Sequence, residues 1–118
     1  AVRVRRIEQR SVITRAIYVL AGSLSHSRPQ SDSLLPSAQT LFIRDWRAKA
    51  LGGREALLMR ADDLVDGEFV RDLGLHVMTV YRVFCDAPHV IYADGLEMGT
   101  ADALADCVPR QALAPNSF

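Results

Sequence analysis

Short apolar segments separated by turn-forming residues run along most of the chain, and their pattern predicts strands. Residues 2–7 and 12–20 alternate in part and are rich in β-branched and aromatic side chains, which favours two strands. The same reasoning predicts further short strands at residues 40–46, 56–59, 68–72, 75–85 and 89–93. Gly, Asp and Pro stand between most of these segments, so we expect an all-β fold of long, bent hairpins.

A few segments lack the strand pattern. Residues 23–37 are rich in Ser and have no periodicity, which predicts a long loop. We expect a single helical turn at 60–65 and a short helix at 100–107, where apolar residues recur at helical spacing. We therefore expect one domain at residues 1–108, followed by a tail at 109–118 that has no pattern of its own.

Composition narrows the class of protein. With 118 residues, of which 49% are hydrophobic and 24% charged, the chain is typical of one globular domain. Its net charge of zero removes the usual electrostatic argument for binding nucleic acid or an anionic membrane. The longest apolar-leaning stretch, at residues 12–24, is shorter than a spanning helix and is interrupted by Thr14 and Arg15. We expect no membrane span, and a location in the cytoplasm or at the periphery of a membrane complex.

Three segments between residues 34 and 96 follow one another in a characteristic order. They read LLPSAQTLFI (34–43), LMRADDLVDG (58–67) and, at 76–96, a hairpin ending in IYADGL. These segments resemble the blocks L-S-P-Q-H-x-L-x, L-V-P-A-R-x-L-V-x-G and V-x-Y-x-H-L-x-x-D-x-H-x-x-x-A-x-G-L of the bacterial Hint (hedgehog/intein) family. The resemblance implies a horseshoe of bent antiparallel hairpins with one or two short helical turns.

The beginning of the chain resembles a later part of the family's first half, the stretch V-x-W-I-G-x-R-x-V. The residues that fit this stretch are Val4, Ile7, Arg10 and Val12. Arg6 and Glu8 replace its Trp and Gly. We therefore expect the chain to correspond to the C-terminal portion of a degenerate Hint domain, without the segment that carries the family's nucleophile.

The resemblance also implies a chemistry. In the family a Cys or Ser nucleophile attacks the preceding carbonyl, a His protonates the leaving amide nitrogen, and further acidic or His side chains assist. Here Gln39, Arg82, Pro88 and Gly99 replace the expected His, His, His and Glu, and Asp86 alone matches. An amide cannot transfer a proton near neutral pH and an Arg remains protonated. The resemblance therefore implies a domain that has lost autoprocessing and is not an enzyme.

We accordingly expect a non-catalytic binding or assembly module, an accessory or structural subunit of a larger bacterial complex, with protein partners and with no cofactor or small-molecule substrate. Our partner-binding candidates are Trp46, Arg44, Tyr81 and Phe118. We expect Trp46 to be at least half buried, in the core or against a partner. We expect the Ser-rich loop and the tail to become ordered on a partner, and the alternative is a loop that packs on its own domain. Two alternatives remain: a fragment of an autoprocessing domain whose nucleophile lies upstream of residue 1, and an unrelated β-domain.

Histidine and cysteine suggest little further chemistry. His26, His76 and His89 are not spaced to prepare a metal site, so we expect no metal. Cys85 and Cys107 form neither a metal motif nor a disulfide framework, and we expect buried thiols. A nucleophile pair of Cys85 and His89 is the alternative, but a triad geometry rarely arises across so tight a turn.

Overall fold

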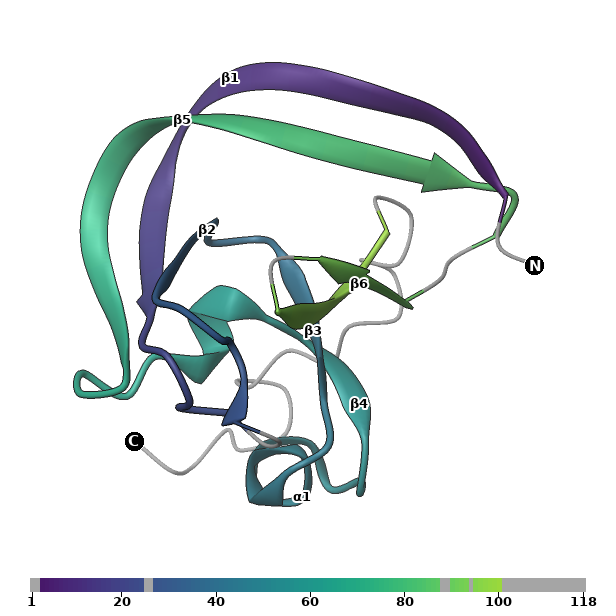
Figure 1. Ribbon diagram of the computed structural model, residues 1–118. Helices are drawn as coiled ribbons and strands as arrows, with labels where there is room; N and C mark the ends of the chain where they lie inside the picture. The colour runs from purple at the N-terminus through teal and green to yellow at the C-terminus, as the bar shows by residue number, and fades with distance from the viewer. Residues whose placement is uncertain (1–2, 25–26, 88–89, 94, 101–118) are drawn as a thin grey trace.

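The computed structural model describes residues 3–24, 27–87, 90–93 and 95–100. These residues form two antiparallel sheets, one short α-helix and one 3-10 turn, which confirms the predicted all-β fold (Figure 1). In chain order the elements are β1 (Val4–Val19), β2 (Ser33–Pro36), β3 (Thr40–Ile43), α1 (Trp46–Gly52), β4 (Leu57–Arg60), η2 (Ala61–Leu64), β5 (Val70–Cys85), β6 (Val90–Ala93) and β7 (Leu96–Gly99).

Several expectations fall on residues outside the described part of the chain. They are the helix that we expected to run on through 101–107, the domain boundary at 108, the tail at 109–118, and the single residues His26, Pro88, His89, Cys107 and Phe118.

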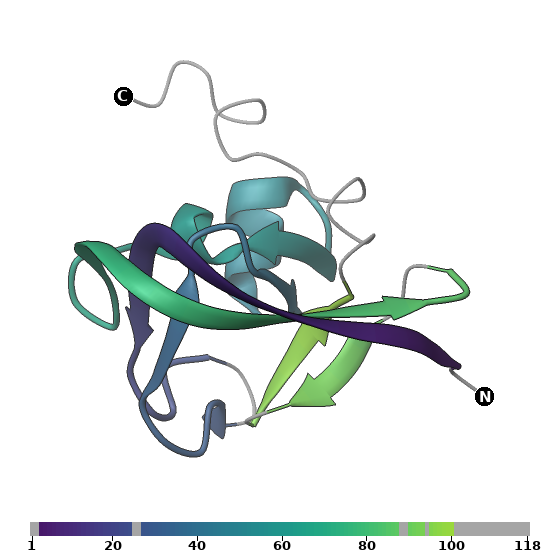
Figure 2. The same cartoon turned by 90° about the horizontal axis from the view of Figure 1, so that it is seen from above.

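The first sheet, in the order β2-β1-β5, is dominated by a long two-stranded ribbon of β1 and β5. Each strand was predicted as two shorter ones, and this was wrong. The ladder continues through a register shift between Arg15 and Ile17, while Gly74 in β5 takes a left-handed φ of 84°. A bulge of this kind bends a ribbon without ending its pairing. Figures 1 and 2 show the resulting curve. The end of the ribbon where β1 begins and β5 ends, which we call its outer end, extends past the second sheet.

The second sheet has the order β4-β3-β7-β6. β3 pairs with β4 from Thr40 to Ile43, and β6 and β7 form a hairpin that joins β3 through Leu41 and Met98. The sequence did not predict β7. Likewise, the predicted loop at 23–37 contains the strand β2. It pairs with residues 16–19 of β1, which we call the inner end of that strand. Both strands are only 4 residues long, so alternation alone gives little signal for them.

The predicted strand at 40–46 ends early, at Ile43, and Trp46 begins the helix α1 instead. The carboxylate of Asp45 accepts a hydrogen bond from the backbone N–H of Arg47 at 2.9 Å and so caps the helix, which ends at Gly53 with φ 70°. This helix start turns Trp46 to the surface, where 68% of it is exposed. The expectation that Trp46 packs in the core was therefore wrong. Its burial against a partner remains a prediction.

The core lies where the inner end of the ribbon meets the second sheet and α1. It contains Ile17 and Val19 of β1, Leu41, Met59 and Leu96 of the second sheet, and further residues of η2 and β5, all with almost no exposed surface. Burial stops at Ala16, and none of the described residues of β1 before it is buried. In β1, only the inner end therefore contributes to the core.

The Ser-rich segment makes several contacts with its own domain, and its ordering on a partner remains a prediction. The carboxylate of Asp32 accepts hydrogen bonds from the Tyr18 hydroxyl and, at 2.7 Å, from the backbone N–H of Ala21. Arg47 donates to the carbonyl of Ser23 at 2.9 Å, and Pro29 is fully buried. These contacts make the described part of the segment a compact surface loop.

Candidate functional site

Two of the five residues at the matched catalytic positions meet in the second sheet. Gln39 stands just before β3, and its backbone carbonyl accepts a hydrogen bond from Ala61 at 2.8 Å. Its side-chain amide donates to the carbonyl of Thr40 at 3.1 Å and to that of Gly99, at the end of β7, at 3.4 Å. Gln39 thus links two strands that are distant in the sequence. An amide in this position can hold a carbonyl, but it cannot donate a proton to a leaving group.

Arg82 and Asp86 lie elsewhere, at the outer end of the ribbon. Arg82 faces Glu8 across the ladder, and its guanidinium carbon is 5.3 Å from the centroid of the Phe84 ring. Asp86 accepts a hydrogen bond from Arg5 at 2.9 Å, in an exposed ion pair that joins the start of β1 to the end of β5. The matched acid is therefore engaged by an arginine of the ribbon rather than by the group around Gln39.

Cys85 and His76 have ordinary structural environments. Cys85 is buried at the end of β5, opposite Val4, which confirms the expected buried thiol. His76 is exposed in the middle of β5, with its ring nitrogen 3.2 Å from the carbonyl oxygen of Leu73. The described residues contain no group of three His, Cys, Asp or Glu side chains that could hold a metal ion. No helix in this part of the chain is long and apolar enough to cross a membrane.

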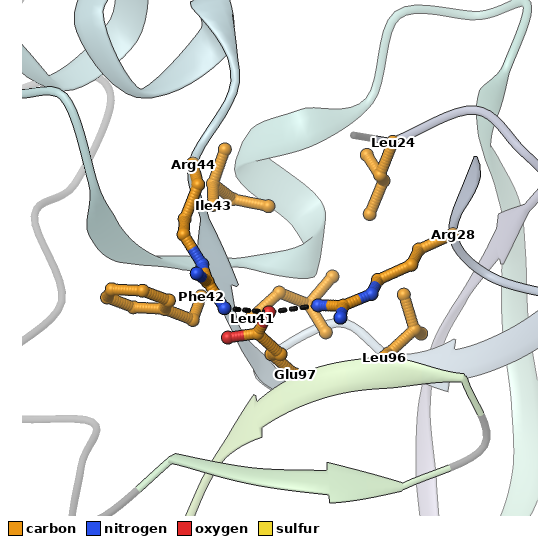
Figure 3. Close-up of a pocket in the computed structure, with 8 residues that line it drawn as sticks. All are labelled: Leu24, Arg28, Leu41, Phe42, Ile43, Arg44, Leu96 and Glu97. Atoms are coloured by element: carbon orange, nitrogen blue, oxygen red, sulfur yellow. Dashed lines mark hydrogen bonds and ion pairs between the residues drawn. The ribbon is translucent and has the colours of Figure 1, made fainter. Parts of the chain in front are cut away.

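A cluster of two arginines around one carboxylate was not predicted from the sequence. Arg28 from the Ser-rich loop and Arg44 from the end of β3 both donate to Glu97 of β7, which they approach from opposite sides (Figure 3). The two guanidiniums also lie over the rings of Tyr92 and Phe42, at 5.1 and 5.4 Å from the ring centroids. The cavity beside them holds about 10 Å³, so there is room for no ligand larger than a water molecule.

Electrostatics fix the charge state of this cluster. Burial raises the pKa of Glu97, but the hydrogen bonds from Arg44 and Arg28 lower it by more, so the pKa lies below its ordinary value. The carboxylate stays ionised and ties the loop to the second sheet. Arg44, one of our partner-binding candidates, is therefore occupied in part by a contact within its own domain.

The other two described candidates for partner binding have side chains exposed to solvent. Trp46 is 68% exposed at the start of α1, with its ring stacked 4.9 Å from the guanidinium of Arg47. Tyr81 is 62% exposed in the outer half of the ribbon, opposite Gln9. Both side chains are accessible to solvent, at two separate places on the surface.

Comparison with known proteins gives the family. A family model described as Hint domain matches residues 2–113, which include every strand described above. Comparisons with curated proteins and with solved structures gave no match.

Proposed function

Because the chain belongs to the Hint domain family, we propose that it is a non-catalytic member that works as a binding or assembly module. The observation that carries the proposal is the hydrogen bond from the Gln39 side chain to the carbonyl of Gly99. Where the family has a proton-donating His, this chain has an amide that spans from β3 to the carbonyl of Gly99. The position now joins two strands, and the Gln39 amide cannot protonate a leaving amide nitrogen.

The one matched acid supports the same conclusion. A general acid must lie within hydrogen-bonding reach of the atom that it protonates. Asp86 is instead paired with Arg5 at the outer end of the ribbon, and 46% of its side chain is exposed. Gln39 and Asp86 therefore belong to two separate sets of contacts.

A binding role is supported by what the surface offers. Trp46 and Tyr81 combine a large apolar area with a polar group, as anchor residues at protein interfaces do. We propose that the chain serves as an accessory or structural subunit of a larger bacterial complex.

The second candidate function is that of an autoprocessing fragment whose nucleophile lies upstream of Ala1. What favours it is the family membership itself, since Hint chemistry starts from a Cys or Ser at the head of the domain. This alternative requires a proton donor other than Gln39, since an amide cannot transfer a proton near neutral pH.

A cleavage assay separates the two functions. A reporter is fused ahead of the chain, with and without the residues that its gene encodes upstream, and is incubated with dithiothreitol or hydroxylamine. We expect mass spectrometry to find both fusions intact. A thiol-dependent product from either fusion would contradict the proposal. The Gln39→His variant is the matched comparison, because it restores only the imidazole at the position that now holds an amide.

A further inference from the structure

Positive charge is concentrated in the outer half of the ribbon, which comprises residues 4–15 of β1 and 75–85 of β5. This half carries five arginines and one acidic residue, a formal charge of +4, although the whole chain has 14 basic and 14 acidic residues and no net charge. The rest of the chain therefore has the opposite formal charge. The arginines are Arg5, Arg6, Arg10, Arg15 and Arg82, and the acidic residue is Glu8.

Contacts within the domain leave much of this charge available to a partner. Arg10 and Arg82 form no ion pair within the described part of the chain. Exposed ion pairs are weak, because water screens both charges. The other three arginines form such pairs, with 55–65% of each arginine side chain exposed: Arg5–Asp86, Arg6–Glu8 and Arg15–Asp72.

The ring of Phe84 orients two of the guanidiniums. Arg6 lies directly opposite Phe84 in the ladder, and its guanidinium carbon is 4.2 Å from the ring centroid. The guanidinium carbon of Arg82 is 5.3 Å from the same centroid. A guanidinium that stacks on a ring still presents the N–H groups at its edge, which can donate two parallel hydrogen bonds to one carboxylate.

The edge of β1 beside these arginines has no neighbouring strand among the described residues. β2 pairs with β1 only from Ala16 to Val19, and β5 lies on the other side of β1. Residues 4–15 therefore present a row of unpaired backbone N–H and C=O groups, to which an extended peptide can add as a further strand. In such a complex the backbone hydrogen bonds give affinity, and the alternating side chains give specificity.

We propose that this edge of β1 binds an extended acidic segment of a protein partner. Arg6, Glu8 and Arg10 are alternate residues of one strand, so they share one face of the ribbon. A strand added beside them would meet Arg6 with its residue i, Glu8 with i+2 and Arg10 with i+4. The segment that fits has acidic residues at i and i+4 and an uncharged residue at i+2. This inference rests on the proposed binding function and gives the chemistry of one partner.

Glu8 favours a protein segment over a uniform polyanion. A nucleic acid or an anionic membrane carries negative charge along its whole length, and part of that charge would lie beside the Glu8 carboxylate. A peptide can place an uncharged residue there and still pair its carboxylates with the arginines on either side.

Fluorescence polarisation of labelled octapeptides, titrated with the full chain, tests the inference. The first probe, Thr-Glu-Val-Thr-Val-Glu-Val-Thr, has its acids at i and i+4. The second, Thr-Glu-Val-Glu-Val-Thr-Val-Thr, has the same composition with the acids at i and i+2. We expect the first to bind with a dissociation constant of about 10 to 100 µM. The second should bind about fivefold more weakly or worse, because only one of its acids can meet an arginine.

Variants of Arg10 test the contact from the side of the protein. Arg10→Gln removes one of the two charges and should weaken binding of the first probe about fivefold. Arg54→Gln is the matched control, because it makes the same change at an exposed arginine outside the ribbon and should leave the affinity unchanged.

A charge exchange gives a gain of binding, which a misfolded variant cannot produce. Arg10→Glu should bind Thr-Glu-Val-Thr-Val-Lys-Val-Thr more tightly than the wild-type chain does, because the new lysine then meets a carboxylate. Hydrogen exchange locates the peptide: the first probe should increase the protection of backbone amides within residues 4–15 of β1.

Three results would overturn the inference: no binding of the first probe, equal binding of the two probes of the same composition, and tighter binding of single-stranded DNA or of phosphatidylserine vesicles than of the first probe. The last result would mean that the arginines serve a polyanion. The cleavage assay is decided separately. A chain that neither cleaves nor binds overturns only the peptide site, and a chain that both cleaves and binds overturns only the proposed non-catalytic function.

Discussion

Isoleucine and valine occur at both ends of β1, but their environments at the two ends are opposite. At the inner end, Ile17 and Val19 are completely buried against the second sheet, whereas Ile7 and Ile13 in the outer half are 62% and 74% exposed. Both parts pair with β5 in one ladder. The difference lies in what covers them, because Ile17 and Val19 belong to the core cluster, whereas the described residues of β1 before Ala16 are exposed or half-buried. An apolar residue in a strand therefore stabilises this domain only where a second layer meets it.

The largest expected effect comes from cutting back a buried residue at the inner end. Ile17→Ala should lower the free energy of unfolding by about 2 to 5 kcal/mol, because it leaves a cavity in the core. Ile13→Ala, the same change four residues earlier in the strand, should alter it by at most about 0.5 kcal/mol. Urea unfolding measures both. Equal losses would show that the outer half of the ribbon is also covered.

A smaller loss should follow from breaking the arginine cluster that joins the Ser-rich loop to the second sheet. Glu97→Gln keeps the shape of the side chain but removes the charge that Arg28 and Arg44 share. We expect a loss of about 1 to 3 kcal/mol, since two guanidiniums would be left without their counter-charge. Glu55→Gln, an exposed position, is the control. Equal stability of the two variants would mean that the cluster does not hold the loop.

Acid should lower the free energy of unfolding of the domain. The pKa of Glu97 is held below its ordinary value by its two arginines, as described above. Burial raises the pKa of Asp66, but backbone N–H groups of Val70, Glu68 and Phe69 lower it by more. A depressed carboxyl pKa stabilises the fold above the unfolded-state value, near 4, and this contribution is lost as the pH falls through the folded-state value.

The measurement is the free energy of unfolding between about pH 6 and about pH 3, in the wild type and in Asp66→Asn and Glu97→Gln. Each variant lacks one of the carboxyls, so its stability should fall less steeply on acidification. Unchanged slopes in both variants would exclude these carboxyls as the cause.

The smallest effect on stability concerns Trp46. With 68% of it exposed at the start of α1, Trp46→Ala should change the free energy of unfolding by at most about 0.5 kcal/mol. A loss of 3 to 5 kcal/mol, the order of magnitude for a core Trp, would contradict the position of α1. If Trp46 anchors a partner, the same variant should weaken that partner's binding without lowering the melting temperature.

Much of the strand content could be predicted from the sequence, because alternation and turn residues are local signals. The helix α1 was missed although its signals were present, with Asp45 before it and Gly53 after it, because it is 7 residues long and follows directly on a strand. The continuity of β1 could not be predicted, since a bulge between Arg15 and Ile17 leaves no mark in the apolar pattern.

The site was predictable in part. Matching the chain to family blocks selected Gln39 and Gly99, and the structure brings these two together. Their contact joins residues far apart in the sequence, and such contacts depend on strand order, which no local pattern encodes. For the same reason, the cluster around Glu97 could not be predicted from the sequence. Its two arginines come from a loop and from the end of a different strand.

The central claim is that only the inner end of β1 belongs to the core and that the apolar residues at 4–15 lie outside it. Hydrogen exchange along β1 tests it most directly. We predict that the backbone amides of Ile17 and Val19 exchange slowly, whereas those of residues 7–13, which can open without disturbing the core, exchange faster. Equal protection along the whole of β1 would contradict the claim.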